Sequence, residues 1–556
     1  MPPRLLSRRA LLVVGGLVAA AAVAAAVVVL AVDDASPPVE VQLLALNDFH
    51  GNLEPPSGSG GRIDGVDAGG AEFLATALRL LAEEVQRPDT ITVAAGDLIG
   101  ASPLLSAAFH DEPTIEALGL TGLDLASVGN HEFDEGADEL LRTQNGGCHP
   151  QDGCADPARP YEGAAFQYLS ANAFVTATGE PLLPPYAVRD VQGVRIGFIG
   201  MTLEGTPDIV TQSGIAGLEF RDEAETANRY AAELQQQGVQ TIVVLLHEGG
   251  TQAGGGINDC VNLTGPIVDI VPRFSDAIDV VVSGHTHQAY NCVLDGRVVT
   301  SASSFGRLVT DIDLRIDSAT GDVIDARARN VVVARDVAPD AAQKDLIGRY
   351  RTLLGPVATE EVGETSAAIT RAGAASGETP LGNLLADAQL RATDDEQGAV
   401  AAFMNPGGVR ADLDAGPVTF EEAFTVQPFG NYLTTLDLTG AQLDCLLEQQ
   451  FVTERTLQPS GTVRYTVRQA GTPGTAADPC AGTKVGNIVI GGVAVDPAAT
   501  YRITVNSFLA DGGDGFSVLT QGTDEVVGGP DLDALIGYFG ANRPTAPPAT
   551  DRITNA

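Results

Sequence analysis

Short apolar runs alternate with amphipathic segments over the first 300 residues of the chain. The apolar runs predict buried strands at residues 41–46, 91–95, 124–128, 194–199, 241–246 and 278–282. Between them, apolar side chains at helical spacing predict helices at residues 71–86 and 222–237. This alternation of strand and helix indicates an α/β domain with parallel strands and right-handed crossovers.

The pattern then changes twice along the chain. Alternating apolar and polar positions predict antiparallel strands at residues 298–300, 308–316 and 323–334. A helical segment at 339–354 ends at Gly355-Pro356, and the α/β pattern restarts near residue 362 with a helix at 380–392 and a strand at 400–404.

Length supports the same division, because 556 residues are too many for one hydrophobic core. We expect one domain at residues 37–335 and a second at 361–545. A connector at 336–360 would join them, and residues 546–556 would form a tail.

A basic start and a long apolar run open the chain. Arg4, Arg8 and Arg9 precede an apolar run over residues 10–32. This pattern predicts a signal peptide that directs the protein to export by the Sec or the twin-arginine route. The run is also long enough to span a bilayer, so residues 1–36 form either a cleaved signal or a membrane anchor. Both alternatives place the globular part outside the cytoplasm, in the cell envelope or the extracellular space.

Charge and cysteine content narrow the class of protein. The formal charge is −40 and no basic run is present, which argues against a nucleic acid polymer as partner. The negative surface would repel a phosphorylated substrate, so binding one would need metal ions or local arginines that make the potential positive at the site. Six cysteines fit an oxidising compartment. Their order suggests the pairs Cys148–Cys154, Cys260–Cys292 and Cys445–Cys480, although fifteen pairings are open and no CxxC spacing indicates zinc.

Metal-binding side chains follow one predicted strand after another. They are Asp48, His50, Asp97, Asn130, His247, His285 and His287. Ligands gather at the carboxyl ends of parallel strands, so we expect these seven side chains to form one site. These four histidines and His131, which follows Asn130, are five of the seven in the chain. His110 and His149 fall outside the strand-end fragments and are predicted to be surface residues.

Seven donors exceed the roughly four to six that one ion takes, which predicts two adjacent divalent ions. Asp97 is the favoured bridge, because Asp48 already pairs with His50. Mixed Asp, Asn and His ligands suit Zn, Mn, Fe or Co, and the sequence does not choose among them. We expect a hydroxide held between the ions to attack phosphate. Asp134 can orient His131 to stabilise the transition state or protonate the leaving oxygen.

These residues carry a family resemblance. Asn47-Asp48-Phe49-His50-Gly51, Gly96-Asp97, Gly129-Asn130-His131-Glu132-Phe133-Asp134, His247 and Gly284-His285-Thr286-His287 together resemble the calcineurin-like metallophosphatases, in particular the secreted 5′-nucleotidase and UDP-sugar hydrolase branch. The resemblance covers about residues 40–545. It implies an α/β, two-domain fold, with an N-terminal metallophosphatase β-sandwich flanked by helices and a C-terminal α/β nucleotide-binding domain.

The resemblance also implies roles for the residues. One ion would be held by Asp48, His50, Asp97 and His287, and the other by Asp97, Asn130, His247 and His285. His131 and Asp134 would form the catalytic dyad. The sequence departs from the family at Ala95-Gly96-Asp97, where family members often have two glycines.

Three glycine-containing loops lie in the second half, at residues 405–410, 427–431 and 506–516. Taken alone, Phe429 and Phe508 fit ordinary core residues. The resemblance implies that they stack on a base, with Asn405 on the base, Asp514 on the ribose and Arg410 on the phosphate. The family usually has one or two further arginines before the Gly-Asn segment, which is Gly382-Asn383 here. Only Arg371 precedes it, at an uncertain register, as a candidate for a second phosphate contact.

By resemblance, the chain is a bifunctional metallophosphatase and 5′-nucleotidase, a phosphoric monoester hydrolase. Its expected substrates are nucleoside 5′-monophosphates, with UDP-sugars, dinucleotides and 2′,3′-cyclic nucleotides as additional candidates. A thiohydrolase of the same fold and a cell-surface binding protein with a degenerate site are the alternatives. Because ions and nucleoside are expected on different domains, we predict a rotation between domains during turnover. The oligomeric state is left open.

Overall fold

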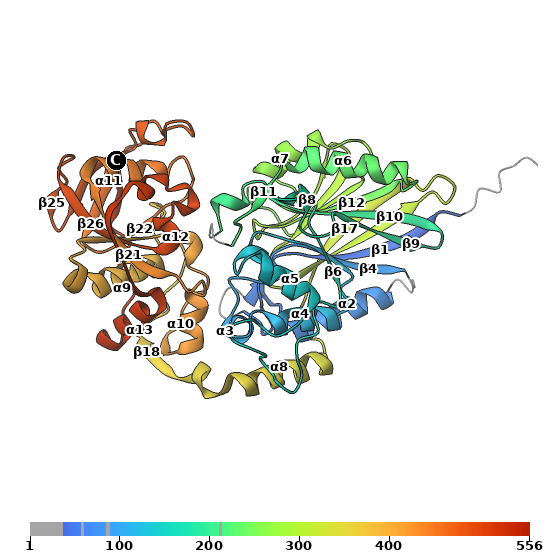
Figure 1. The fold of residues 1–556 in the computed structure, drawn as a ribbon, viewed down its shortest axis with the longest axis horizontal. Coiled ribbons are helices and arrows are strands. Elements are labelled where there is room, and N and C mark those ends of the chain that lie inside the picture. The colour runs from blue at the N-terminus through green and yellow to red at the C-terminus, as the bar shows by residue number, and fades with distance from the viewer. Residues whose placement is uncertain (1–36, 57–60, 85–88, 211–213) are drawn as a thin grey trace, which may run out of the picture.

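The computed structural model describes residues 37–56, 61–84, 89–210 and 214–556. The leader expected at residues 1–36 lies outside the described residues. Two domains lie side by side, and helix α8 (Ala341–Leu354) connects them below (Figure 1). No helix among the described residues combines the length and apolar character needed to cross a membrane.

Two six-stranded sheets form the N-terminal domain. The first sheet has the order β17-β16-β1-β4-β5-β6, with bounds Val323–Val332, Leu308–Ile316, Val39–Leu46, Thr90–Ala95, Leu125–Ser127 and Gln167–Leu169. The second has the order β14-β15-β13-β12-β10-β9, with bounds Ala289–Leu294, Arg297–Ala302, Val280–Ser283, Thr241–His247, Val194–Thr202 and Tyr186–Val191. These strands confirm the sequence prediction for every N-terminal run named above.

Three apolar layers hold this domain together. Leu43, Val93, Phe198 and Leu245 belong to the core shared by the two sheets. Outside the first sheet pack α2 (Ala71–Glu84), α4 (Glu112–Leu120), α5 (Ala137–Asn145) and α8, and outside the second pack α6 (Glu223–Gln236) and α7 (Pro266–Ile270). The domain is therefore a β-sandwich flanked by helices, and the predicted fold class is confirmed.

Strand direction places the loops that follow the strands. β1, β4, β5 and β6 are parallel in one sheet, and β10, β12, β13 and β15 are parallel in the other. The antiparallel prediction for residues 298–300 is confirmed on one side of β15 only, because β15 runs parallel to β13 on the other. Strand β14, which the prediction missed, forms a hairpin with β15 and is its antiparallel neighbour. β16 and β17 are antiparallel as predicted.

A five-stranded sheet forms the centre of the C-terminal domain. Its order is β22-β19-β26-β21-β27, with bounds Gln458–Pro459, Ala401–Met404, Thr500–Asn506, Tyr432–Thr439 and Thr523–Pro530. One apolar cluster involves α9 (Pro380–Gln397), α10 (Phe420–Val426) and α13 (Asp531–Ala541), and another involves α11 (Gly440–Gln449). The domain is α/β, as predicted.

Smaller elements complete this domain. β18 (Glu361–Thr365) pairs with β20 (Gly416–Thr419), and a four-stranded sheet contains β25 (Val493–Ala494), β24 (Val485–Ile490), β23 (Val463–Val467) and β28 (Ile553–Asn555). β28 lies in the segment predicted as a tail, and it pairs in parallel with β23. The domain boundaries drawn from the sequence stay predictions.

All six cysteines pair as their order suggested. The disulfides are Cys148–Cys154, Cys260–Cys292 and Cys445–Cys480. The first closes a short surface loop after α5, the second joins a loop after β12 to β14, and the third links α11 to the loop before β24.

Candidate metal centre and interdomain cavity

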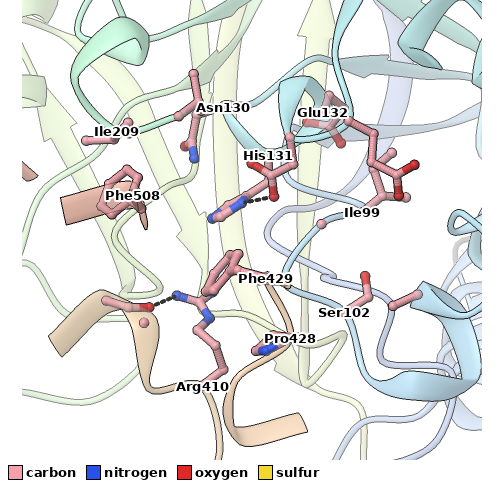
Figure 2. A pocket seen from close by; sticks show the side chains of 18 of the residues that line it. Ile99, Ser102, Asn130, His131, Glu132, Ile209, Arg410, Pro428, Phe429 and Phe508 are labelled. Carbon is pink, nitrogen blue, oxygen red and sulfur yellow. Dashed lines mark hydrogen bonds and ion pairs between the residues drawn. The ribbon is translucent and has the colours of Figure 1, made fainter. Parts of the chain in front are cut away.

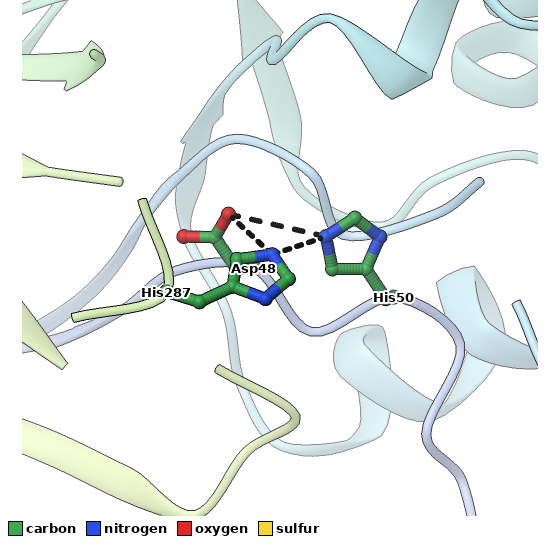
Figure 3. A group of neighbouring side chains, drawn as sticks. All are labelled: Asp48, His50 and His287. Carbon is green, nitrogen blue, oxygen red and sulfur yellow. Dashed lines mark hydrogen bonds and ion pairs between the residues drawn. The ribbon is translucent and has the colours of Figure 1, made fainter. Parts of the chain in front are cut away.

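The loops after β1, β4, β5 and β13, together with His247 at the end of β12, bring the seven predicted metal-binding side chains together. Asp48, His50 and His287 form one group (Figure 3). The Nε2 atoms of His50 and His287 lie 3.0 Å apart, and His287 Nε2 lies 3.3 Å from Asp48 Oδ1. Side chains from two sheets thus face one small volume.

Asp97 is shared between this group and a second one. Its Oδ2 atom lies 2.9 Å from His247 Nε2 and 3.6 Å from His50 Nε2. Asp97, His247 and His285 form the second group, and His285 Nδ1 lies 3.1 Å from Asn130 Oδ1. The carboxylate that the sequence favoured as a bridge lies between the two sets of donors.

The backbone aims two imidazoles inward. His50 Nδ1 lies 2.8 Å from the Gly100 carbonyl oxygen, and His247 Nδ1 lies 2.7 Å from that of Ala95. A carbonyl only accepts, so in each ring Nδ1 carries a hydrogen and Nε2 is the atom turned toward the other donors, where it can bind an ion once it is free of a proton. Such an outer partner is typical of metal-binding histidines.

Five of the candidate ligands have an unusual backbone conformation. Asp48, His50, Asp97, His285 and His287 have φ between 47° and 69°. Side-chain-bearing residues adopt this left-handed region rarely, and such strain clusters at functional sites. At Gly129, a β-carbon would overlap the Asp97 carboxylate. A glycine is therefore needed there for the loop after β5 to approach the loop after β4.

The electrostatics of the site favour a positive charge at its centre. Burial opposes ionisation of Asp97, but the His247, His131 and His50 imidazoles outweigh it and hold the pKa of Asp97 well below its usual range. Burial also opposes a charge on His247, yet Asp97 raises its pKa to about 10. By contrast, burial lowers the pKa of His285 to about 3, so this ring is neutral and can donate a lone pair.

The donor set fits divalent transition metals. His247 Nε2 is fully buried and close to Asp97, yet it makes no hydrogen bond of acceptable geometry. A buried nitrogen that faces a carboxylate without bonding to it is what an ion between the two would require.

His131 and Asp134 lie beside these donors. His131 Nδ1 is 2.7 Å from Asp134 Oδ2, and the His131 main-chain N–H donates to Asp97 Oδ1 at 2.9 Å. Burial works to lower the pKa of His131, but the Asp134 and Asp97 carboxylates raise it above its ordinary value. The imidazole is therefore held in one orientation next to the shared carboxylate.

A cavity of about 280 Å³ joins this centre to the C-terminal domain. From the N-terminal domain it is lined by Asn130, His131, Asp134 and His285. From the C-terminal domain it is lined by Asn405, Arg410, Phe429, Phe508 and Asp514. Figure 2 shows His131, Arg410, Phe429 and Phe508 around the same space. The structure brings together five of the six predicted substrate-binding residues.

Local contacts orient the C-terminal residues. The Asn405 amide donates to Asp514 Oδ2 at 2.9 Å and accepts from Asn506 Nδ2 at 2.9 Å. The Arg410 guanidinium lies 5.7 Å from the centre of the Phe429 ring. Arg371 lies apart from this cavity: with Arg410 it lines a neighbouring one, and its Nε is 3.3 Å from Asp412 Oδ1.

Sequence reasoning missed three residues of this site. Glu132 accepts hydrogen bonds from the main-chain N–H groups of Asp97 and Leu98 at 3.0 and 2.8 Å, and from that of Gly129. Asn431 and Arg455 line the cavity, and Arg455 Nε is 3.3 Å from Asp514 Oδ1. Glu132 and Asn431 stand inside fragments already singled out, whereas nothing in the sequence marks Arg455.

Two family models match the chain. Residues 41–289 match the calcineurin-like phosphoesterase, and residues 356–521 match the 5′-nucleotidase C-terminal domain.

Relatives and a solved structure extend the match over nearly the whole chain. Endonuclease YhcR of Bacillus subtilis is 34% identical over 507 residues, which are 90% of this chain but 39% of that protein. Cell wall protein Lmo0130 of Listeria monocytogenes is 31% identical over 540 residues, 91% of this chain and 67% of that protein. A crystal structure of a 5′-nucleotidase precursor from Thermus thermophilus is 26% identical, with a TM-score of 0.76, and the match covers 93% of this chain and 99% of that one.

Proposed function

Because the chain belongs to the 5′-nucleotidase family, with a calcineurin-like phosphoesterase domain followed by a 5′-nucleotidase C-terminal domain, we propose that it releases phosphate from nucleoside 5′-monophosphates. The observation that carries this proposal is the single cavity that joins the donors around Asp97 to two phenylalanines and a carboxylate of the other domain. A phosphate at the donors and a nucleoside at the aromatic rings would fill it from both ends.

The metal centre is proposed to hold two divalent ions. Asp48, His50, Asp97 and His287 would hold one, and Asp97, Asn130, His247 and His285 the other. Such a pair lowers the pKa of a water molecule toward neutrality and neutralises charge on a phosphoryl group.

His131 and Asp134 are proposed as the catalytic dyad. With its Nδ1 atom held by Asp134 at 2.7 Å, His131 presents Nε2 to the cavity as a proton donor. A proton on Nε2 can stabilise charge on the phosphoryl oxygens or neutralise the departing nucleoside 5′-oxygen. Arg410 adds a fixed positive charge from the C-terminal domain, close enough to affect the pKa of His131 and His287.

Nucleoside recognition falls to the C-terminal domain in this proposal. Phe429 and Phe508 would stack on the base, which accepts any base because each has a π face. Asp514 would accept hydrogen bonds from the ribose hydroxyls. The Asn405 amide donates a hydrogen bond to Asp514. Asn405 would therefore contact the base and also position the Asp514 carboxylate. Arg371, outside this cavity, is left for a longer phosphate chain, as in UDP-sugars or dinucleotides.

Other activities make distinct demands on the site. The relative from Bacillus is named an endonuclease, but the chain spans only 39% of that protein, and a net charge of −40 opposes binding of a polyanion. A thiohydrolase would have no use for Phe429, Phe508 and Asp514 together. A binding protein with a degenerate site would not need every donor of the cluster to be present.

Export is part of the proposal. Three disulfides and a relative named as a cell wall protein support a position in the cell envelope or outside the cell. The leader at residues 1–36 would direct it there, as a cleaved signal or as an anchor.

One assay separates these functions. The purified chain, stripped with a chelator and given Mn²⁺, is incubated with AMP, UDP-glucose, bis(4-nitrophenyl) phosphate, a single-stranded oligonucleotide and a thiosulfate ester. We expect phosphate and adenosine from AMP, no hydrolysis without metal and no cleavage of the oligonucleotide. Hydrolysis of the oligonucleotide alone or of the thiosulfate ester alone would replace the proposed activity, and metal-dependent AMP binding without turnover would point to the binding protein.

A further inference from the structure

His110 and His149 lie stacked on each other outside the metal centre. Their ring centroids are 3.7 Å apart and their planes meet at 14°. The sequence predicted both as surface residues, yet their side chains are only 22% and 10% exposed. The five histidines at strand ends belong to the site already described, so this pair is a separate feature.

Carboxylates surround the two rings. Glu135 Oε2 lies 2.6 Å from His110 Nδ1. On the other side, Asp152 Oδ2 lies 3.0 Å from His110 Nε2 and 3.5 Å from His149 Nδ1. Glu139 is 4.0 Å from His149 Nε2, but Arg142 neutralises it through hydrogen bonds from Nε and Nη2.

Independent elements fix the two histidines. His110 lies in the corner between α3 (Leu104–Ala107) and α4, where it and Asp111 have φ of 50° and 58°. The Asp111 carboxylate secures that corner by accepting from the Gly100 main-chain N–H and the Ser106 hydroxyl. His149 lies in the loop closed by Cys148–Cys154, and its N–H and C=O both bond to Gly153. The arrangement is therefore built before any ligand arrives.

We propose that His110, His149 and Glu135 form a third cation site, specific for a divalent transition metal such as Zn²⁺. One nitrogen of each histidine and one oxygen of Glu135 lie within 4.8 Å of one another. Zinc binds histidine nitrogen and carboxylate oxygen at roughly 2.0–2.2 Å, so the stacked rings and Glu135 would rotate toward one another when an ion binds. Imidazole and carboxylate ligands together suit zinc, cobalt and nickel.

Asp152 completes the arrangement from outside. When His110 gives Nδ1 to the ion beside Glu135, its Nε2–H faces the Asp152 carboxylate. A carboxylate on the second nitrogen fixes the tautomer of a metal-binding histidine and increases its basicity. The cluster thus offers both an inner set of ligands and an outer partner.

This site borders the interdomain cavity. His110, Glu135 and Glu139 line that cavity together with His131 and Asp134. The wall on this side carries several carboxylates and would repel an anionic substrate. An ion bound between His110 and Glu135 would reduce that repulsion, and it would tie the 148–154 loop to the α3–α4 corner.

Metal counting tests the proposal directly. The full-length protein, the H149Q and E135Q variants and the control E162Q are stripped, loaded with Zn²⁺, freed of excess by gel filtration and analysed for zinc. Glu162 is an exposed carboxylate of the same surface segment. We expect H149Q and E135Q to hold one zinc fewer per chain than the wild type, and E162Q to equal it. Equal zinc in all four proteins would overturn the proposal.

A second background separates this site from the dinuclear centre. In a D97N variant, which removes the shared carboxylate, we expect one zinc to remain and to be lost on adding H149Q. Co²⁺ in that background should give d–d absorption that disappears with H149Q. These readouts do not depend on hydrolytic activity, so they hold even if the proposed function is wrong. D97N without any bound zinc, while circular dichroism shows it folded, would also refute the third site.

Discussion

The ring centroids of His131 in one domain and Phe429 in the other lie 5.7 Å apart, and the two ring planes meet at 20°. The proposed acid and one of the proposed base-stacking rings are thus in contact across the domain boundary. In this conformation the two halves of the cavity face each other, as catalysis on a nucleotide would require.

Arg351 links the same two domains at the hinge side. From α8 it bonds to Glu54 of the N-terminal domain and, at 2.8 Å, to Glu421 of the C-terminal domain. We expect R351Q to weaken the closed arrangement by about 1 kcal/mol, because these side chains are partly exposed. Small-angle X-ray scattering should show a larger radius of gyration for R351Q. R349Q, which loses a contact with Glu116 inside one domain, is the matched control. An unchanged radius in R351Q would mean that the ion pairs do not hold the domains closed.

Truncation of the aromatic rings should weaken substrate binding selectively. Stacking of a base on an aromatic ring contributes about 1–3 kcal/mol, so F508A should raise KM for AMP by roughly 5- to 150-fold. F429A should do the same and also lower kcat, since its ring contacts His131. Ribose 5-phosphate has no base and serves as the control substrate. If F508A affected AMP and ribose 5-phosphate equally, Phe508 would not be a base-stacking residue.

Removal of the imidazole should slow the chemical step. We expect H131A to lower kcat for AMP by about 10²- to 10⁴-fold with unchanged metal content, and D134N to cause a smaller loss. 4-Nitrophenyl phosphate distinguishes the two proposed roles, because 4-nitrophenolate leaves without a proton. A smaller loss with that substrate indicates protonation of the leaving oxygen, and an equal loss indicates charge stabilisation. H131A with wild-type kcat on both substrates would remove His131 from the mechanism.

Glu132 holds the loops of two ligands together. Its carboxylate accepts from the N–H groups of Asp97, Leu98 and Gly129, and a glutamine would place an NH₂ donor against at least one of them. E132Q should weaken metal binding by about 10- to 100-fold. Excess metal should restore most of kcat, which separates a positioning residue from a catalytic one. E233Q, on the outer helix α6, is the control and should bind metal normally. Normal metal affinity in E132Q would show that the loops keep their position without this carboxylate.

Asp279 should make stability depend on pH. Burial raises the pKa of Asp279 to about 7, although its Oδ2 accepts from the Ile242 N–H at 2.9 Å. The folded state therefore holds a proton that the unfolded state loses near pH 4, so stability falls as pH rises from about 4 to 7. D279N keeps an acceptor for Ile242 and carries no charge. Its free energy of unfolding at pH 8 should exceed that of the wild type by roughly 1–4 kcal/mol, with little gain at pH 4.5.

Thermal unfolding at both pH values measures this effect. D322N, on an exposed neighbour of the same region, is the control and should show a much smaller change. An equal gain for D279N at pH 4.5 and pH 8 would mean that Asp279 is not protonated in the folded protein.

Local sequence determined the strands and the types of ligand. Apolar runs such as residues 41–46 and 241–246 have the length and the continuous apolar character of strands in a sheet covered on both faces, and the polar residue that ends each run lies at a strand end. The histidines that follow these strands could be identified in the same fragments. The order of the cysteines gave the disulfides because each bond joins two cysteines that are consecutive in the sequence.

Tertiary structure alone decided which distant side chains meet. The hairpin of β14 with β15 has a local signal in Asp295-Gly296, both at positive φ, but the parallel pairing of β15 with β13 joins strands that no short pattern connects. Arg455 reaches Asp514, and His149 stacks on His110, only because the loops that carry them fold onto other elements. Hydrophobic pattern and ligand chemistry act over a few residues and can be read from the chain. The separation between side chains remote in sequence depends on the packing of whole layers, which one sequence does not display.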